Sequence, residues 1–396
     1  MTALTPEQLI AFRRDLHRHP ELSHQESRTA AKVAEALRAA GLAPATGIAG
    51  HGVVAILEGD HPGPTLLFRA DMDALPITEE SRHGYESCNP GVMHACGHDV
   101  HTTVGVGVAS LLASRRADLH GRIKFVFQPA EEAAPPPGQV IGAELMVREG
   151  VLESPAVDAA FALHVMPLLE AGKIGCTGGA VWAGSDIFDI HLTGSMAHGA
   201  YPHEGIDPIV AAAAVIQALQ SLVARETDAR EAAVVSVCRI TAGTAYNIIP
   251  DRAHLQGTIR TLSTSVRERL LARFNELVKA VATAYGCTAE IALVQGAHVT
   301  TNNPTLERLF AERIGGLATV PFKPQMGAED FSAFARRVPA AFLFLGVRNE
   351  ERGIVHMIHT PRFDVEESVI PTAVESMSEA LLATARDWAT IAPQLS

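Results

Sequence analysis

Apolar runs and stretches with helical periodicity alternate along most of this 396-residue chain. The helical patterns lie at roughly 5–18, 25–40, 101–115, 139–150, 207–225, 263–285, 303–315 and 366–389. Short runs that predict strands lie at 53–57, 66–68, 123–128, 159–165, 187–192, 233–240, 253–259, 289–293 and 341–345. Regular alternation of helices and strands predicts an α/β fold with a mainly parallel central sheet.

The strands in the middle of the chain differ from those on either side. Five outer strands are mainly apolar, which predicts burial on both faces: 53–57, 66–68, 123–128, 159–165 and 341–345. Between 186 and 295 the predicted order is strand, helix, strand, strand, helix, strand, and polar and apolar positions alternate, as in 187–192. That pattern predicts a sheet with one exposed face. We therefore predict an α+β domain at 186–295, inserted into a domain formed by 1–185 and 296–396.

Composition and charge narrow the class of protein. The net charge is −12 and no run of Lys or Arg occurs, so nucleic acid is a poor candidate for a partner. The five widely spaced cysteines argue against a disulfide framework and for a reducing compartment. Thr5 and Gln8 form a predicted capping box at the start of the first helix, which is unlike a signal peptide. Since no run reaches the roughly 18 apolar residues of a membrane span, we predict a cytoplasmic protein.

Side chains that bind metals follow the ends of the predicted buried strands, where sites in open α/β sheets gather. The candidate ligands are Cys96, His98, Glu132, His164 and His359. This set suits Zn, Mn, Co or Ni. Glu131 and Glu132 are adjacent, and their mutual repulsion would be relieved by a cation. On spacing alone, a metal site and an unrelated set of core and surface residues both remain open.

Seven motifs add a family resemblance: 69–76, 93–101, 128–132, 194–198, 247–250, 257–260 and 326–331. In this order they resemble the dinuclear metal amidohydrolases of the aminoacylase and carboxypeptidase superfamily, in the branch of hippurate hydrolase and the auxin–amino-acid conjugate hydrolases. The resemblance covers nearly the whole chain. It implies a zinc-peptidase-like catalytic domain with two divalent metal ions, interrupted by a lid domain through which such enzymes usually form homodimers.

The resemblance also assigns the metal ligands. It implies that the ligands are Cys96, His98, Glu132, His164 and His359. Cys96 would bridge the two ions, and Asp73 would orient a ligand histidine. Many relatives carry a histidine where this chain has Asp71, and a bridging aspartate where it has Cys96. The hippurate-hydrolase branch shares both departures, so they place the chain within that branch.

The implied reaction is hydrolysis of the amide bond of an N-acyl amino acid. Glu131 would be the general base that takes a proton from water and later gives it to the leaving amine. His198 of a partner subunit would stabilise the oxyanion, and Asn247 and Arg260 would bind the substrate carboxylate. Without the resemblance, His198 and Asn247 would be interpreted as turn residues and Arg260 as a charge at a strand end.

Three other functions remain open on the sequence. Cys96 could be a nucleophile with His98 as its base, although their spacing is poor and both adjacent glutamates would be unused. A non-catalytic, metal-dependent binding protein would have no need of Glu131. A metallo-dipeptidase or aminopeptidase would need a carboxylate for the free substrate amine, and the sequence identifies none.

Overall fold

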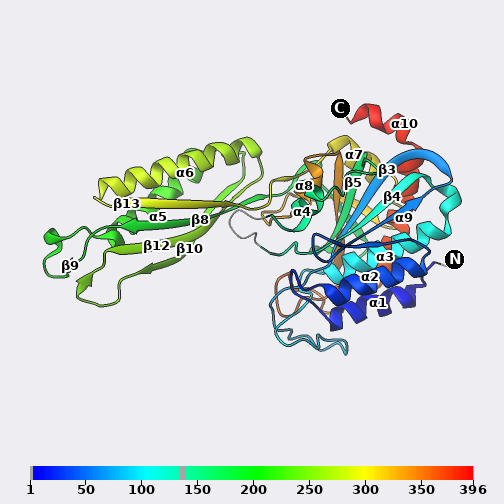
Figure 1. Ribbon diagram of the computed structural model, residues 1–396, viewed down its shortest axis with the longest axis horizontal. Helices are drawn as coiled ribbons and strands as arrows, with labels where there is room; N and C mark the ends of the chain where they lie inside the picture. Colours follow the sequence, from blue (N-terminus) through cyan, green and yellow to red (C-terminus); the bar gives the residue numbers. More distant parts are fainter. Residues whose placement is uncertain (1–2, 134–139, 396) are drawn as a thin grey trace. The chain divides into compact units, whose positions relative to one another are not determined.

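The structure is a computed structural model that describes residues 3–133 and 140–395. It contains two compact units (Figure 1). Unit 1 is formed by Met1–Gly179, Thr301–Lys323 and Asp330–Ser396, and unit 2 by Ala180–Thr300 and Pro324–Glu329. The predicted insertion, 186–295, lies within unit 2. The sequence did not predict the return of 324–329, which joins unit 2 because Trp182 pairs with Gln325.

Unit 1 is built on an eight-stranded mixed sheet with a parallel centre. The strand order is β1-β2-β4-β3-β5-β16-β6-β15. The strands are β1 (Ala45–Ile48), β2 (Gly52–Glu58), β3 (His61–Asp71), β4 (His120–Gln128), β5 (Ala159–Glu170), β6 (Lys173–Cys176), β15 (Ala318–Pro321) and β16 (Ala340–Arg348). Strands β4, β3, β5 and β16 run parallel, which confirms the predicted fold class.

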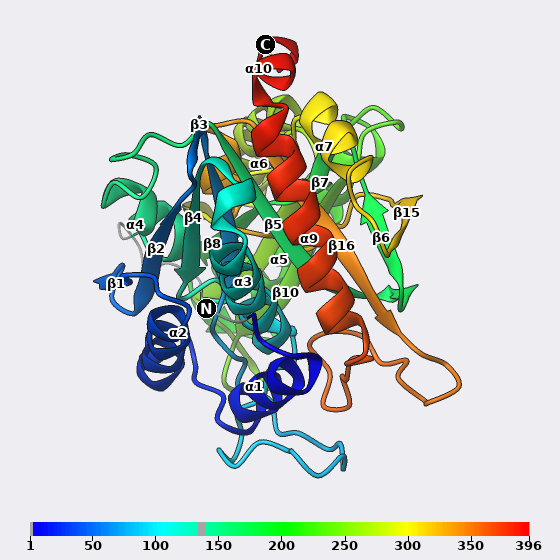
Figure 2. The same cartoon turned by 90° about the vertical axis from the view of Figure 1, so that its right-hand side faces the viewer.

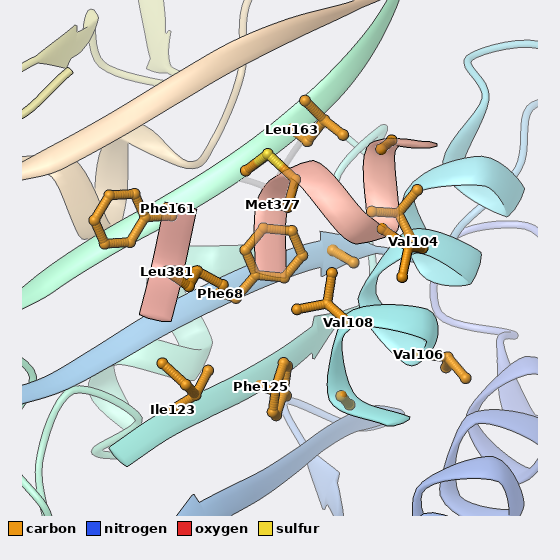
Figure 3. Packing of buried hydrophobic residues seen from close by; sticks show 14 of the residues in the cluster. Phe68, Val104, Val106, Val108, Ile123, Phe125, Phe161, Leu163, Met377 and Leu381 are labelled. Atoms are coloured by element: carbon orange, nitrogen blue, oxygen red, sulfur yellow. The ribbon is translucent and has the colours of Figure 1, made fainter. Parts of the chain in front are cut away.

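Helices cover this sheet and form the main core. They are α1 (Pro6–Arg18), α2 (Ser27–Ala39), α3 (His98–Ser114), α4 (Gly142–Arg148), α7 (Pro304–Ala311), α8 (Ser332–Ala335), α9 (Val369–Arg386) and α10 (Trp388–Ile391). Helices α3 and α9 lie side by side across the sheet (Figure 2). Val104 of α3 and Met377 of α9 meet Phe68 of β3 in the core (Figure 3). The capping box of Thr5 and Gln8 is present at α1, as predicted.

Unit 2 has a four-stranded antiparallel sheet in the order β10-β12-β8-β13. Its elements are β8 (Gly184–Thr193), α5 (Pro208–Ala224), β10 (Ala233–Ala242), β12 (Arg252–Thr261), α6 (Thr264–Ala284) and β13 (Thr288–Gln295). Alternate residues of β8, including Phe188, Ile190 and Leu192, are buried in a core shared with α5 and α6. The opposite face of the sheet carries the polar residues that alternate with them.

Short elements complete the chain. They are β7 (Gly179–Trp182), β9 (Ala197–His198), β11 (Ile248–Ile249), β14 (Thr300–Asn302) and the 3-10 helices at Arg116–Asp118, Pro202–Glu204 and Ala392–Gln394. Strands β9 and β11 pair with each other, as do β7 and β14. None of the helices in the described parts of the chain is long and apolar enough to cross a bilayer.

Several element predictions were wrong in detail. Strand β2 is not buried on both faces, because Val54 and Ile56 remain partly exposed while its alternate residues pack against α2 and α3. The helix predicted at 101–115 begins at His98, so His101 lies in its first turn. Part of the helix predicted at 139–150 falls outside the described residues, and the described part is α4.

Candidate metal centre

The five candidate ligands come together at the carboxyl end of the parallel strands of unit 1. Glu132 follows β4, and His359 lies in the loop between β16 and α9. The sequence placed His164 at the end of its strand, but β5 continues to Glu170. Pairing of β5 with β3 stops at Ala162, whereas His164 still pairs with β16. His164 therefore lies beyond the last residue of β5 that pairs with β3, and its ring reaches Cys96.

The ligand atoms form two groups that share one sulfur atom. Cys96 Sγ lies 3.5 Å from His164 Nε2 and 3.3 Å from His359 Nε2. Glu132 Oε1 lies 3.2 Å from His359 Nε2 and 3.8 Å from His98 Nε2. Cys96, His98 and His164 make one group within 4.8 Å, and Cys96, Glu132 and His359 make another.

These separations, and two buried atoms that make no hydrogen bond within the described residues, fit metal ions. Two atoms bonded at about 2.0–2.3 Å to one tetrahedral ion lie roughly 3.3–3.8 Å apart. His98 Nε2 and Glu132 Oε1 are buried and make no hydrogen bond within the described residues. Buried polar atoms without partners are costly unless something binds them. The residues present therefore fit a pair of divalent ions that share the Cys96 sulfur.

Asp73 contacts two of the candidate ligands, His98 and Glu132. Its Oδ1 lies 3.1 Å from His98 Nδ1, and its Oδ2 accepts a hydrogen bond of 2.9 Å from the backbone N–H of Glu132. Ser23 Oγ donates to the same Oδ2 at 2.6 Å. The bond to Nδ1 turns His98 so that Nε2 faces the other ligands. The orienting role of Asp73 stays a prediction, and these hydrogen bonds are the contacts through which it would act.

We expect Asp73→Asn to weaken metal binding by about 10- to 100-fold, because an amide cannot accept hydrogen bonds at both of its terminal atoms. Equilibrium dialysis against zinc, followed by metal analysis, measures the effect. Ser23→Ala is the matched control, since it removes one hydrogen bond to Asp73 but leaves its contacts with His98 and Glu132. Equal zinc affinity in Asp73→Asn and the unchanged protein would contradict the orienting role.

The carboxylates around the centre raise the pKa of a histidine and of the cysteine among the candidate ligands. Burial opposes protonation of His98, but the nearby carboxylates of Asp71 and Asp73 raise its pKa to about 10. Burial and the carboxylates of Glu132 and Glu131 raise the pKa of the Cys96 thiol well above its usual value. Both shifts reflect an excess of negative charge in a buried site, which is the environment that a divalent cation neutralises.

A second buried network, which the sequence did not reveal, supports the centre. Asp71 accepts a hydrogen bond of 2.5 Å from His101 Nδ1 and one of 2.6 Å from Arg69. His101 Nε2 in turn accepts 2.9 Å from the backbone N–H of Val165, next to His164. His101 is therefore a structural link between β3, α3 and β5. The sequence signal that could have indicated this role is the position of His101 three residues after His98, on the same side of α3.

The loop before α3 depends on a glycine. Gly97 has a φ of 85°, and a Cβ built there would lie 2.3 Å from a methyl carbon of Val165. Only glycine combines that backbone conformation with so close an approach. Gly97 thus separates Cys96 from His98 in a way that lets both side chains face the same point.

Glu131 lies beside the ligands, on the bend after β4. Its carboxylate is near enough to Cys96 to contribute to the raised pKa of the thiol. The preceding residue, Ala130, has a φ of 55°, and its N–H donates to Glu26 Oε1 at 2.8 Å. This fixed turn presents two successive carboxylates to one centre, with Glu132 among the ligand atoms and Glu131 next to them.

The other predicted site residues lie in unit 2. The pairing of β9 with β11 places Asn247 beside His198, and the Asn247 carbonyl accepts a hydrogen bond of 2.8 Å from Gly199 N–H. His198 is exposed, and its Nδ1 accepts from Ala200 N–H at 3.0 Å. Arg260 is at the far end of β12, where it bonds to Thr258 Oγ1. Within unit 2, therefore, His198 and Asn247 share a loop cluster and Arg260 stands apart from them.

Residues 67–383 match the model of peptidase family M20/M25/M40. The chain belongs to this family. It is 37% identical over 378 residues to thermostable carboxypeptidase 2 of Saccharolobus solfataricus, covering 95% of this chain and 94% of that protein. It is 37% identical over 377 residues to N-acetylcysteine deacetylase of Bacillus subtilis, covering 94% and 95%.

Two further M20 relatives extend the comparison. IAA-amino acid hydrolase ILR1-like 4 of Arabidopsis thaliana is 36% identical over 371 residues, covering 92% of this chain and 82% of that protein. A dinuclear metal-binding M20 peptidase from Bacillus subtilis superposes with a TM-score of 0.83 at 34% identity, covering 96% and 98%. The resemblance seen in the sequence is thereby confirmed, and the chain is a hydrolase of the M20 family.

Proposed function

We propose that this M20 hydrolase cleaves the amide bond of N-acyl amino acids, with two divalent metal ions held by Cys96, His98, Glu132, His164 and His359. The observation that carries the proposal is the pair of ligand groups that share Cys96 beside the carboxylate of Glu131. Relatives named for the deacetylation of N-acetylcysteine and the hydrolysis of IAA–amino acids support this substrate class. The ligand set suits Zn, Mn, Co or Ni.

In this mechanism the protein orients water and moves its proton. Divalent ions bound at the five ligands would lower the pKa of a water and polarise the substrate carbonyl. Glu131 takes the proton of the attacking water and returns it to the amine nitrogen as the amide bond breaks. Asp73 keeps His98 and Glu132 in place while the charge of the centre changes. The products are a free amino acid and a carboxylic acid.

His198, Asn247 and Arg260 complete the proposal from unit 2. The N–H of Ala200 donates to His198 Nδ1, so neutral His198 carries its proton on Nε2. Nε2 is then a donor for the oxyanion of the tetrahedral intermediate. Arg260 and Asn247 would bind the carboxylate of the amino acid. We propose that the protein forms a homodimer in which His198 serves the partner's metal centre.

A mixture of two inactive variants tests whether His198 acts at the metal centre of the partner subunit. We expect Glu131→Ala and His198→Ala, each nearly inactive alone, to regain activity when unfolded and refolded together, because half of the mixed dimers' sites then contain both groups. Activity assays on the mixture, with mixed dimers resolved by a tag on one variant, measure the gain. Mixed dimers that form and stay inactive would contradict a role for His198 across subunits.

Three alternative functions are less well supported than hydrolysis of N-acyl amino acids. The carboxypeptidase name of one relative keeps peptide hydrolysis as a second candidate on the same centre. Nucleophilic catalysis by Cys96 is disfavoured, because burial and the neighbouring carboxylates raise the pKa of its thiol and oppose formation of a thiolate nucleophile. A non-catalytic binding protein would leave Glu131 without a purpose.

The deciding experiment is a substrate panel with and without metal. We expect an N-acyl amino acid, chosen among hippurate, N-acetyl-methionine and an indoleacetyl-amino acid, to be hydrolysed, with a dipeptide as the comparison. Chelation should abolish hydrolysis, and added Zn, Mn, Co or Ni should restore it. Full activity after verified metal removal would instead support the thiol mechanism. Cleavage of the dipeptide alone would support the peptidase.

A further inference from the structure

A second set of metal-binding side chains lies on the open face of the unit 2 sheet. Asp189 and His191 are two positions apart on β8, so both point to the face opposite the core residues Phe188 and Ile190. His254 of β12 is the direct cross-strand partner of His191. Strands β8 and β12 are neighbours in the sheet (Figure 1), and their register places His191 directly opposite His254.

The three side chains converge on one carboxylate oxygen. His254 Nε2 lies 2.7 Å and His191 Nε2 lies 2.9 Å from Asp189 Oδ1. The two imidazole rings are parallel within 7°, with centroids 4.2 Å apart. Asp189 Oδ2 accepts a hydrogen bond of 2.7 Å from Gln256 Nε2, which holds the carboxylate in this orientation. All three ligand atoms lie within 4.8 Å of one another, as they would around a single ion.

Strand β13, which pairs with β8 on the side opposite β12, carries another carboxylate at the level of His191. Glu290 of β13 is the cross-strand partner of His191 on the side opposite His254. Residues in such direct register have Cβ atoms about 4.5–5.5 Å apart, within reach of a glutamate side chain. The row thus runs His254, His191, Glu290 across three strands, with Asp189 in the adjacent row.

Ions and water can reach the cluster from solvent. The side chain of His191 is 54% exposed and that of His254 27% exposed. An open pocket of about 340 Å³ is lined by His191 and His254 together with Met196, Thr244 and Ile248. The site would therefore take up an ion without a change in the fold, and water would fill any coordination position that the protein leaves open.

We propose that Asp189, His191 and His254 form a separate binding site for one divalent transition-metal ion, with Glu290 as an additional ligand. Two imidazoles and a carboxylate suit Zn, Ni, Cu or Co and do not suit Mg or Ca, which prefer oxygen ligands alone. A bound ion would join β8 to β12 through side chains. This site is independent of the centre in unit 1, because the two share no residue.

Metal stoichiometry tests the proposal on the full chain. We expect equilibrium dialysis against zinc to show one more equivalent per chain in the unchanged protein than in His254→Asn or His191→Asn. Loss of one ligand should lower the affinity for this additional zinc ion by at least about tenfold.

His120→Asn is the matched control, because His120 stacks on His61 at 4.6 Å in unit 1 and so tests the loss of one ring from another histidine pair. It should keep the additional zinc. Circular dichroism confirms that each variant is folded. The same zinc content in His254→Asn and the unchanged protein would overturn the proposal and leave a hydrogen-bonded histidine–aspartate cluster.

Discussion

Glu131→Gln is expected to lower kcat by about 10²- to 10⁴-fold while both metal ions remain bound. The amide cannot take a proton from the attacking water, yet it occupies nearly the same volume beside the ligands. Glu131 is a member neither of the group of Cys96, His98 and His164 nor of the group of Cys96, Glu132 and His359. Steady-state kinetics on the best substrate of the panel, together with metal analysis of the same sample, measure both effects.

The neighbouring carboxylate gives this experiment a close control. Glu132→Gln makes the same chemical change one residue away, but Glu132 lies 3.2 Å from His359 Nε2 among the ligands. It should lose metal as well as activity, and excess metal should restore part of that activity. Glu131→Gln should not respond to excess metal. A Glu131→Gln protein that retains normal kcat, or that loses its metal, would show that the two roles are assigned wrongly.

Cys96→Ala is expected to remove both ions and to abolish hydrolysis, because the sulfur atom belongs to both ligand groups. The variant removes a ligand from each ion and leaves a gap at the middle of the centre. Metal analysis after dialysis, with the activity of the same sample, measures the result. Loss of one ion only would contradict the bridging position.

Cys176→Ala is the control for the loss of a thiol from unit 1. Cys176 lies on β6 and is partly buried, but it is not among the predicted ligands. Its replacement should leave the metal content unchanged. A Cys96→Ala protein that is inactive and still holds two ions would revive Cys96 as the nucleophile.

The sequence predicted the parts of the fold that depend on local pattern. The long apolar runs became β3, β4, β5 and β16, and the alternating pattern in 187–192 became the half-exposed strand β8. The five candidate ligands could be named from their residue types, their spacing and the family resemblance, and the structure brings them together. Their roles in catalysis stay predictions until the variants are measured.

What the sequence missed depends on contacts between distant segments. The extension of β5 to Glu170 is supported by pairing with β16, about 180 residues later in the chain. The link from Asp71 through His101 to Val165 joins three elements, and its one trace in the sequence is the position of His101 three residues after His98. Residues 324–329 join unit 2 through pairing with Trp182, which no local signal indicates.

The strand order of unit 1 has a consequence for synthesis on the ribosome. Strand β16 lies inside the sheet, between β5 and β6, yet it is the last strand to be made, and His359 follows it. Unit 2 is contiguous apart from one short segment and can fold while unit 1 still lacks an inner strand. Until then the apolar edge of β5 is open to pairing with other chains. Nascent chains that stop before β16 should therefore be substrates for chaperones, and no truncated product can assemble a complete metal centre.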